Sequence, residues 1–318
     1  MLSFIVKKRC CILACLLLLS GCAGTRPKIE IPATQPPPPK FAKRPQVVVV
    51  LGSGGARGYA HLGVLQALKE AHIPIDGLVC ASVGCVVGAL YADSRSVKKA
   101  YRIMMQAGFW NFADVANTPG PSGLMTGYHL EKYLLANMRA RNFGQLKIPL
   151  LIATTDLLTG HSYLIQGGPI APAVLASAAL PGVVRPIQLY GRVLIDGGVS
   201  APVPVKFAAL LRPKAIIAIN IARNLFPKIP SGAYSIYSRA YQIMWLQLTD
   251  LSQSDADVVI RPYVGDAGTF DMGQRYQLYL EGLKAGKEMI PTIKKMLQHK
   301  NVTLTSGSAH INLRRVVR

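Results

Sequence analysis

One stretch of sequence decides the fold: residues 47–58 read VVVVLGSGGARG. Val47–Leu51 is an unbroken apolar run rich in β-branched residues, which is typical of a strand covered on both faces in a parallel sheet. A glycine-rich turn ends this run, and apolar residues then recur at helical spacing at Ala60, Val64, Leu65 and Leu68. The folded region therefore opens near Gln46 with a strand, a tight turn and a helix.

The same order of elements repeats directly downstream. Gly77–Ala81 is a second short apolar strand, and Val83–Ala92 has the pattern of a helix. Further strands are predicted at residues 149–154, 193–195, 215–219 and 258–260, and further helices at residues 128–140 and 277–297. This alternation predicts an α/β fold, a three-layer α/β/α sandwich with a mostly parallel central sheet, over residues 46–300.

Composition agrees with a large folded domain and narrows its partners. Of the 318 residues, 50% are hydrophobic and 16% charged, which is too apolar for a disordered chain. The 36 Lys and Arg stand against 15 Asp and Glu, a formal net charge of +21. Such a surface attracts an anionic partner, and charge alone leaves nucleic acid, lipid headgroups and cell-wall polymer open.

The N-terminus has the pattern of a targeting signal. Three basic residues, 7–9, precede ten continuous apolar residues, 10–19, and then the small pair Ser20-Gly21. This is typical of a secretory signal peptide, because about 20 apolar residues are needed to span a membrane. We therefore expect residues 1–21 to be removed.

Cys22 directly follows this signal. Leu19-Ser20-Gly21-Cys22 resembles the lipobox of bacterial lipoproteins, which implies that Cys22 becomes the lipidated first residue. Ala23 stands where an Asp would favour the inner membrane, so by analogy with Gram-negative lipoproteins we expect the outer membrane. An ordinary export signal with an incidental cysteine is the alternative. Export of either kind argues against nucleic acid as the partner.

Low-complexity segments flank the predicted domain. Residues 22–45 are rich in proline, including Pro36–Pro39, which favours extended polyproline II and predicts a semi-rigid tether after Cys22. Residues 301–318 are polar, contain no acidic residue and end in arginine, so we expect a basic C-terminal tail.

The cysteines do not suggest a disulfide framework. Four lie in the first 22 residues, which leaves Cys80 and Cys85 for the domain. Their spacing differs from the C-x-x-C redox pattern, so we expect two buried free thiols, with a disulfide as the alternative. No cluster of thiolates is available for a metal ion, and no metal site is predicted.

Ser82 lies between the second strand and its helix, within the segment CASVG at residues 80–84. A sharp strand-to-helix turn exposes a serine hydroxyl at the carboxyl edge of the sheet and points a helix N-terminus at it, as in a nucleophile elbow. The usual G-x-S-x-G motif has glycine where Cys80 stands. Taken alone, the position also fits a serine N-cap.

The turn at residues 54–58, GGARG, can present consecutive backbone N–H groups to an anion. One candidate is a dinucleotide pyrophosphate, with Asp76 at the distance of a ribose-binding acid. Aligning Gly52 and Gly54 with G-x-G-x-x-G, however, places Arg57 where the third glycine must pack. The oxyanion of an acyl-transfer intermediate is therefore favoured.

Asp196 is the candidate base for a serine nucleophile. It follows the strand at residues 193–195 and precedes Gly197-Gly198, a turn that would present its carboxylate at the sheet edge that carries Ser82. Taken alone, Asp-Gly-Gly is an ordinary turn. The six histidines share no motif, and none follows a strand as a triad histidine would.

In this order, the segments at residues 54–58, 80–84 and 196–198 resemble the three motifs of the patatin-like phospholipase family, and the resemblance extends over about residues 46–297. Residues 122–134, 155–160 and 176–187 look like its bacterial branch. The resemblance implies a patatin-like fold and a Ser-Asp dyad without histidine, in which Ser82 is the nucleophile and Asp196 accepts its proton.

The resemblance also implies the rest of the site. The oxyanion hole would be formed by the amides of Gly54, Gly55 and Ala56, with positive charge from Arg57 nearby. Four further glycines would support the turns: Gly58, Gly84, Gly197 and Gly198. Ser53 and Cys80 depart from the family motifs, and neither position holds a catalytic side chain.

The implied activity is that of a serine acyl hydrolase, which cleaves fatty-acyl esters of phospholipids or other lipids through an acyl-enzyme and without a cofactor. An acyltransferase or thioesterase with the same dyad, and a non-catalytic envelope lipoprotein, are the alternatives. The expected partners are the acyl-ester substrate and the membrane, through the lipid anchor and an anionic surface.

Two segments are candidates for substrate access. Residues 101–127 hold Met and aromatic side chains that suit acyl chains or a core, and we favour the core for most of them. Tyr234, Tyr237, Tyr241 and Trp245 follow helical spacing. This pattern favours a packed helix over an interfacial one.

Overall fold

The computed structural model of the chain describes residues 29, 31–38, 44–114 and 123–305. The described residues from 31 to 305 belong to one compact unit, and the fold below is that of this unit. The predicted signal peptide, the lipidation site Cys22 and residues 306–318 of the predicted tail lie outside the described residues. Of the helices described, none has both the length and the apolar character needed to cross a bilayer.

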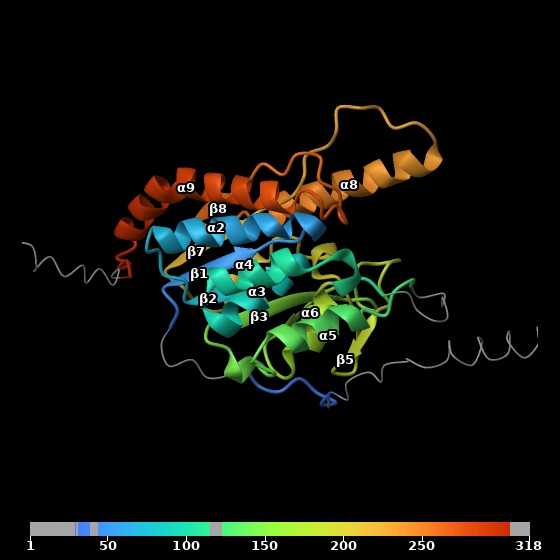
Figure 1. Cartoon of the computed structure of the whole chain (residues 1–318), viewed down its shortest axis with the longest axis horizontal. Coiled ribbons are helices and arrows are strands. Elements are labelled where there is room, and N and C mark those ends of the chain that lie inside the picture. The colour runs from blue at the N-terminus through green and yellow to red at the C-terminus, as the bar shows by residue number, and fades with distance from the viewer. Residues whose placement is uncertain (1–28, 30, 39–43, 115–122, 306–318) are drawn as a thin grey trace, which may run out of the picture. The chain divides into compact units, whose positions relative to one another are not determined.

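One eight-stranded sheet forms the centre of the described unit (Figure 1), in the order β5-β6-β3-β2-β1-β7-β8, with β4 paired to β3 off this path. The strands are β1 (Val47–Leu51), β2 (Gly77–Ala81), β3 (Leu150–Asp156), β4 (Ser162–Ile165), β5 (Ile187–Leu189), β6 (Arg192–Ile195), β7 (Ala215–Ile219) and β8 (Val258–Ile260). The pairs β8–β7, β7–β1, β1–β2 and β2–β3 are parallel, and the pairs β3–β4, β3–β6 and β5–β6 are antiparallel. The prediction of a mostly parallel α/β sheet is confirmed.

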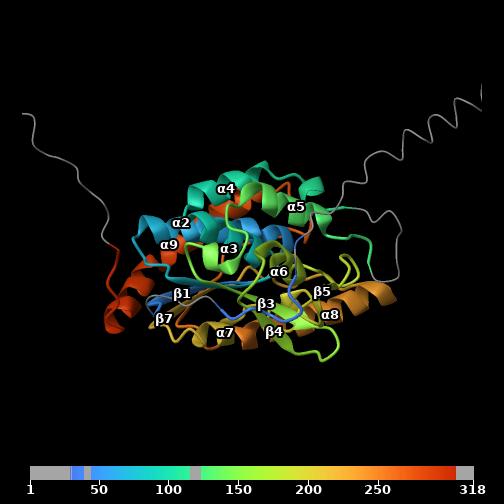
Figure 2. The same ribbon diagram turned by 90° about the horizontal axis from the view of Figure 1, so that it is seen from below.

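Helices cover the two faces of the sheet unequally (Figure 2). One face carries α2 (Tyr59–Glu70), α3 (Val83–Ser94), α4 (Val97–Gln106), α5 (Tyr128–Asn137), α6 (Ile170–Ser177) and α9 (Arg275–His299). The other face carries α7 (Val205–Ala209) and the C-terminal end of α8 (Ala233–Ser252). Short 3-10 helices are η1 (Gly55–Gly58), η2 (Phe109–Asn111), η3 (Phe143–Gln145) and η4 (Gly197–Val199). The predicted three layers are present, and one of them is thin.

The strand β1 divides its side chains between the two halves of the core. Val47, Val49 and Leu51 belong to the larger cluster, and Val48 and Val50 to the smaller one, all without exposed surface. Successive side chains of a strand point to opposite faces, so a sheet covered on both sides needs an apolar residue at every position. This is why the run at 47–51 contains no polar residue.

The proline-rich segment contacts the domain over its described length. Residues 31–38 belong to the compact unit. Pro36 passes so close to Gly167 that a Cβ on this glycine would lie 2.4 Å from the Pro36 carbonyl oxygen. Residues 31–38 of the predicted semi-rigid tether therefore lie along the domain.

Helices α2 and α9 cross at two glycines. A Cβ on Gly63 would lie 2.1 Å from Tyr279 O, and a Cβ on Gly282 would lie 2.0 Å from Ala60 O. No side chain fits at either position, so the two backbones are in direct contact. This contact fixes α2, the helix that begins directly after the glycine-rich turn, to the last helix described.

Replacing Gly282 with alanine should lower the melting temperature. At an exposed helical site the same change stabilises by about 1 kcal/mol, because alanine is the better helix former. Here the added methyl group meets backbone atoms, and overpacking costs about 1–3 kcal/mol. Gly144→Ala is the control, because nothing lies within 4 Å of a Cβ there. Equal melting temperatures for the two variants would contradict the close crossing.

Candidate active site

Ser82 occupies the turn between β2 and α3 with φ 55 and ψ −129. Positive φ is unfavourable for a residue with a side chain, and such strained residues cluster at active sites. The turn is tight because α3 begins against β1: a Cβ on Gly84 would lie 2.3 Å from Leu51 O. The segment therefore has the geometry of a nucleophile elbow.

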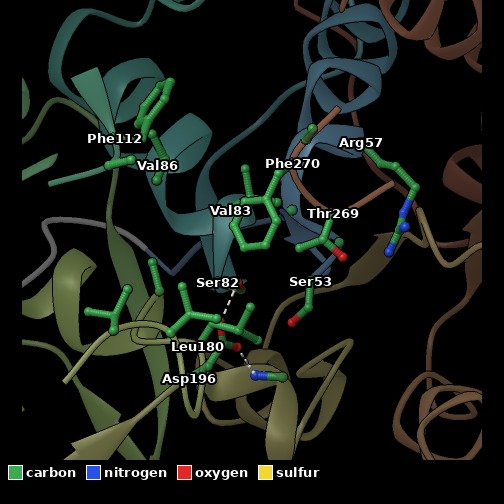
Figure 3. A pocket seen from close by; sticks show the side chains of 18 of the residues that line it. Ser53, Arg57, Ser82, Val83, Val86, Phe112, Leu180, Asp196, Thr269 and Phe270 are labelled. Carbon is green, nitrogen blue, oxygen red and sulfur yellow. Dashed lines mark hydrogen bonds between the residues drawn. The ribbon is translucent and has the colours of Figure 1, made fainter. Parts of the chain in front are cut away.

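The Ser82 hydroxyl donates a hydrogen bond to Asp196 Oδ2 over 2.6 Å (Figure 3). Asp196 Oδ1 accepts the amide of Gly198 at 2.7 Å. The Asp196 backbone is also held, because its N–H donates to Ala179 O and its carbonyl accepts the Thr155 hydroxyl, both at 2.9 Å. The structure thus brings together the two residues predicted as the dyad.

The register of β3 explains how they meet. Ala81 pairs with Ala153 in the parallel pair β2–β3, so Ser82 follows at the level of Thr154. Ile195 pairs with Thr155 in the antiparallel pair β3–β6, so Asp196 reaches the same level from the opposite direction. Asp196 was predicted at the same sheet edge as Ser82, and it reaches that level in an unexpected way, because β6 runs antiparallel to β3.

Burial sets the pKa of Asp196. The residue is 5% exposed. Burial raises its pKa to about 6, although the hydrogen bonds from Ser82 and Gly198 act in the opposite direction. The carboxylate is therefore a stronger base than that of an exposed aspartate, and it is still ionised at neutral pH.

The glycine-rich turn folds as η1 beside the dyad. The amide of Ala56 donates to Thr269 O at 2.8 Å and that of Arg57 to Gly54 O at 3.3 Å, so neither is free to bind a ligand. The amides of Gly54 and Gly55 have no acceptor among the described residues. The oxyanion hole predicted from three amides is thus narrowed to these two. Gly55 has φ 58, and a Cβ there would lie 2.4 Å from Thr269 O, so only glycine fits.

The Arg57 side chain holds this turn in place from within the protein. It is 7% exposed, and its guanidinium donates from Nε to Ile221 O at 3.0 Å and from Nη1 to Ala267 O at 3.1 Å. Burial, followed by the charge of Arg223, lowers its pKa to about 10, so the side chain is still cationic at neutral pH. The predicted positive charge is present in the wall of the site.

The other glycines predicted to support the turns also lie at close approaches. A Cβ on Gly58 would lie 2.4 Å from Val83 Cγ2, and one on Gly197 would lie 2.1 Å from Ala153 O. At Gly198 it would lie 2.4 Å from Ser53 Oγ. Substitution at any of them would push apart the elements that carry the dyad and the glycine turn.

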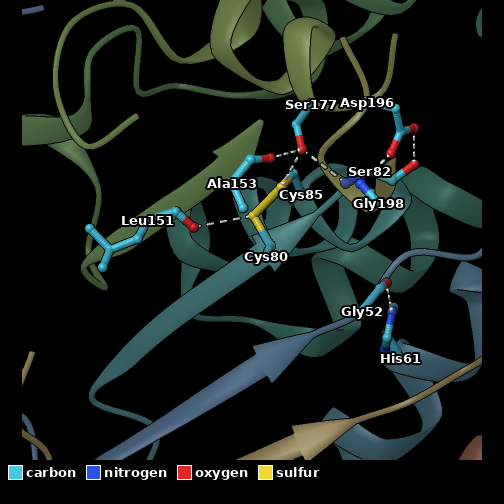
Figure 4. Close-up of a disulfide and its surroundings, with 10 residues drawn as sticks. All are labelled: Gly52, His61, Cys80, Ser82, Cys85, Leu151, Ala153, Ser177, Asp196 and Gly198. Atoms are coloured by element: carbon cyan, nitrogen blue, oxygen red, sulfur yellow. Dashed lines mark hydrogen bonds between the residues drawn. A yellow bond between two sulfur atoms is a disulfide. The ribbon is translucent and has the colours of Figure 1, made fainter. Parts of the chain in front are cut away.

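Cys80 and Cys85 form a disulfide across the Ser82 turn (Figure 4), which corrects the prediction of two free thiols. The turn reverses the chain and brings their Cα atoms to 4.9 Å, within the range that a disulfide requires. Spacing along the sequence could not reveal this, because the local geometry at Ser82 creates the proximity. The bridge ties the end of β2 to the first turn of α3 on both sides of the serine.

Ser177, at the end of α6, is a site residue that the motifs did not reveal. Its Oγ accepts the amide of Ser82 at 2.9 Å and donates to Ala153 O at 2.6 Å (Figure 4). It therefore fixes the backbone of the nucleophile, and the Ser82 amide is not available to a ligand. Trp245 has a similar supporting place, since its Nε1 donates to Gly198 O at 2.9 Å. The sequence placed Ser177 in a segment that resembles the family and Trp245 in a candidate helix for substrate access, but it gave neither residue a role in holding the dyad.

His61 supports the glycine turn and does not contact the dyad. It is fully buried, and its Nε2–H donates to Gly52 O at 2.8 Å. Burial lowers its pKa to about 4, so the imidazole is neutral.

The dyad opens into a cavity of about 580 Å³, a size typical of sites for small molecules. Figure 3 shows Phe112, Val86 and Leu180 on one side of Ser82 and Ser53 and Thr269 on the other. Further apolar lining comes from Met104, Met125, Leu130, Leu175, Val183 and Val184. Several side chains of the segment 101–127 thus line the cavity in addition to packing in the core.

Ser53 contributes a polar group to this cavity. It is 6% exposed, lines the cavity, and its hydroxyl oxygen has no hydrogen-bond partner within the described structure. The residue was noted in the sequence only as a departure from the glycine of the family motif. Its free hydroxyl makes it a further candidate for contact with a ligand.

Comparison with known proteins identifies the family. A family model described as patatin-like phospholipase matches residues 49–209. An uncharacterized NTE family protein of Mycobacterium bovis is 36% identical over 179 residues, 56% of this chain and 49% of that protein. Patatin-like phospholipase domain-containing protein 6 of Mus musculus is 29% identical over 299 residues, 81% of this chain and 22% of that protein. The chain thus spans about half the length of the mycobacterial relative and less of the mouse one.

A solved structure is similar in fold. VipD from Legionella pneumophila superposes with a TM-score of 0.53 at 13% sequence identity, covering 86% of this chain and 72% of that one. At this identity the likeness concerns the fold alone. It agrees with the predicted patatin-like architecture.

The Asp196→Asn variant should be more stable than the wild type at pH 8. Because burial raises the pKa of Asp196 from 3.8 to about 6, the folded state binds this proton more tightly than the unfolded state. Stability contributed by the protonated form is therefore lost as the pH rises from about 4 to about 6, and asparagine avoids that loss. Thermal melts from pH 4 to pH 8 would show a gain of several degrees at the upper end only.

Asp114→Asn is the control, because its expected effect on stability at pH 8 has the opposite sign. Burial tends to raise the pKa of Asp114, but hydrogen bonds from Thr126, Gly127 and Tyr128 outweigh it and lower the pKa. This variant should lose stability at pH 8. A loss of stability in both variants would contradict the cost assigned to the buried Asp196 carboxylate.

Proposed function

Because the chain belongs to the patatin-like phospholipase family, we propose that it is a serine acyl hydrolase that cleaves fatty-acyl esters of phospholipids or related lipids. One observation carries the proposal: the 2.6 Å hydrogen bond from the Ser82 hydroxyl to the buried Asp196 carboxylate, at the wall of a largely apolar cavity. The hydroxyl faces a base, and apolar side chains are in place for an acyl chain.

In the first half of the proposed reaction, Ser82 Oγ attacks the ester carbonyl carbon while Asp196 Oδ2 takes the hydroxyl proton. The negative charge that develops on the carbonyl oxygen is bound by the unpaired amides of Gly54 and Gly55, and the free Ser53 hydroxyl is a further donor in the same wall. When the intermediate collapses, Asp196 returns the proton to the leaving alcohol, and an acyl-Ser82 ester remains.

Water reverses these roles in the second half. Asp196 takes a proton from the water that attacks the acyl-Ser82 carbonyl, and then returns it to Ser82 Oγ as the fatty acid leaves. The Gly198 amide and the Thr155 hydroxyl hold Asp196 through both halves, so the same carboxylate faces each nucleophile in turn. The proton balance closes without a histidine or a cofactor.

We also propose that the protein acts in the cell envelope, anchored by lipid at Cys22 in the outer membrane. The N-terminal sequence pattern supports this placement. The buried Cys80–Cys85 disulfide gives independent support, because disulfides persist in oxidising compartments and are rare in the cytosol.

Ser82→Ala should abolish the release of fatty acid, and Asp196→Asn should reduce it at least about a thousandfold, because proton acceptance by a positioned base is lost together with oriented attack. The measurement is fatty-acid release by the purified chain from phospholipids, lysophospholipids and neutral glycerides. Unchanged melting curves for Ser82→Ala would show that the fold is intact. Undiminished hydrolysis by either variant would refute the dyad.

Hydrolysis of an uncharged ester should decline as the pH falls through about 6. Burial raises the pKa of Asp196 to about 6, and protonation of this residue removes the base. Below pH 6, kcat/KM should therefore fall about tenfold for each further pH unit. The measurement is kcat/KM from pH 4.5 to 8.5 with a soluble short-chain ester. A profile that bends near pH 4 would mean that Asp196 titrates as an exposed carboxylate.

A further inference from the structure

Helix α8 projects from the body of the domain (Figure 1), and Thr249 is the buried residue among its 20. One stripe of the helix, which includes Tyr234, Tyr241 and Trp245, lines the cavity of the dyad. Apolar side chains outside the cavity lining are exposed as well: Tyr237 and Met244, on the flank of this stripe, are 71% and 61% exposed, and Ile236 and Ile243, on the far side of the helix, are 55% and 39% exposed. Because a helix that faces only water carries polar residues on its outer face, these exposed side chains indicate a binding partner. The prediction of a packed helix is therefore wrong for most of α8.

The loop that leads into α8 extends the same surface. Ile229 is 90% exposed, and Leu225 and Phe226 are also exposed. We call residues 223–244 the α8 arm. The arm borders the cavity through Arg223, Tyr234 and Tyr241, which line it.

The charge of the arm is of one sign. It carries Arg223, Lys228 and Arg239, and the sequence contains no acidic residue between Asp196 and Asp250. Two of the cations are held to the arm itself: Arg223 lies 4.7 Å from the centre of the Phe226 ring, and Arg239 donates to Lys228 O at 3.2 Å. An exposed apolar surface with fixed cations and no carboxylates complements a surface that is apolar inside and anionic outside.

We propose that the α8 arm docks the mouth of the cavity on an anionic phospholipid bilayer. The proposal rests on the proposed function and adds to it the physical state of the substrate, a lipid still packed in a membrane. Tyrosine, isoleucine and methionine side chains enter the interfacial layer while Lys228 and Arg239 contact headgroup phosphates. Since the inner stripe of the same helix lines the cavity, an acyl chain passes from bilayer to Ser82 along continuous apolar surface.

A second copy of this chain fits the arm less well. In a two-fold contact the same surface meets itself, so Lys228 and Arg239 would face their own counterparts. With no acidic residue from 197 to 249, the arm has no carboxylate to pair with them. The like charges would oppose that contact, whereas they favour an anionic bilayer.

The test measures the partition of the full chain onto phosphatidylcholine vesicles with and without phosphatidylglycerol. All proteins carry Cys22→Ser, which removes the predicted lipid attachment, and Ser82→Ala, which keeps the vesicles intact. Ile229→Ser with Tyr237→Ser should weaken binding at least about tenfold. Lys228→Gln with Arg239→Gln should weaken binding to anionic vesicles about thirtyfold at low salt, and this effect should become small at high salt. Leu210→Ser, at a residue 65% exposed outside the arm, is the control and should leave binding unchanged.

The same substitutions in the chain with Ser82 intact separate this proposal from the proposed function. None of the four substituted arm residues lines the cavity, so hydrolysis of a soluble short-chain ester should stay unchanged. Hydrolysis of vesicle lipid should fall in parallel with vesicle binding. Absence of ester hydrolysis in every form would refute the function and leave the vesicle result standing. Vesicle binding unaffected by both pairs of substitutions, or a concentration-dependent dimer that they disperse, would overturn the docking role of the arm.

Discussion

The site depends on the hydrogen bond between Ser82 and Asp196, two residues that lie 114 positions apart in the sequence. Strand β3 holds them in place: it pairs with β2 in parallel on one side and with β6 in antiparallel on the other. A shift of either register by one residue would turn one of the two side chains away from the other. The mixed pairing at this end of the sheet is therefore a requirement of the dyad.

This arrangement has unfavourable local features that the surrounding structure must compensate. Ser82 has a positive φ, Asp196 is a buried carboxylate without an ion-pair partner in the described structure, and the amides of Gly54 and Gly55 lack acceptors there. Each costs free energy in the folded state. The disulfide, the Ser177 hydroxyl and the packing around the glycines hold these turns in place.

Much of this structure was predictable from the sequence because the signals are local. The apolar run 47–51 and the strand 258–260 have the predicted bounds, since buried strands of a parallel sheet carry uninterrupted apolar residues. The short antiparallel strands β4 and β5 were not predicted, because three or four partly exposed residues give no clear pattern. The motif identified Asp196, but it did not show that the preceding strand, β6, runs antiparallel to β3.

The remaining differences from the sequence-based predictions depend on three-dimensional geometry that the sequence pattern does not show. The Ala56 amide is taken by Thr269, more than 200 residues away, and Ser177 has no motif of its own. The disulfide follows from the shape of the Ser82 turn, and the exposure of α8 from the absence of a covering layer in the described fold. Periodicity along the chain showed that residues 234–245 form a helix, but it could not show which neighbours that helix lacks.

The place of β1 in the sheet has a consequence for the time at which the protein can fold during its synthesis. This first strand pairs with β2, made soon after it, and with β7, made more than 160 residues later. The glycine turn that follows it rests on Thr269 and on α9, through α2. Long-range pairings of this kind form slowly. A nascent chain therefore carries its serine long before it has a working oxyanion hole, and the site assembles only after Thr269 and α9 have been made.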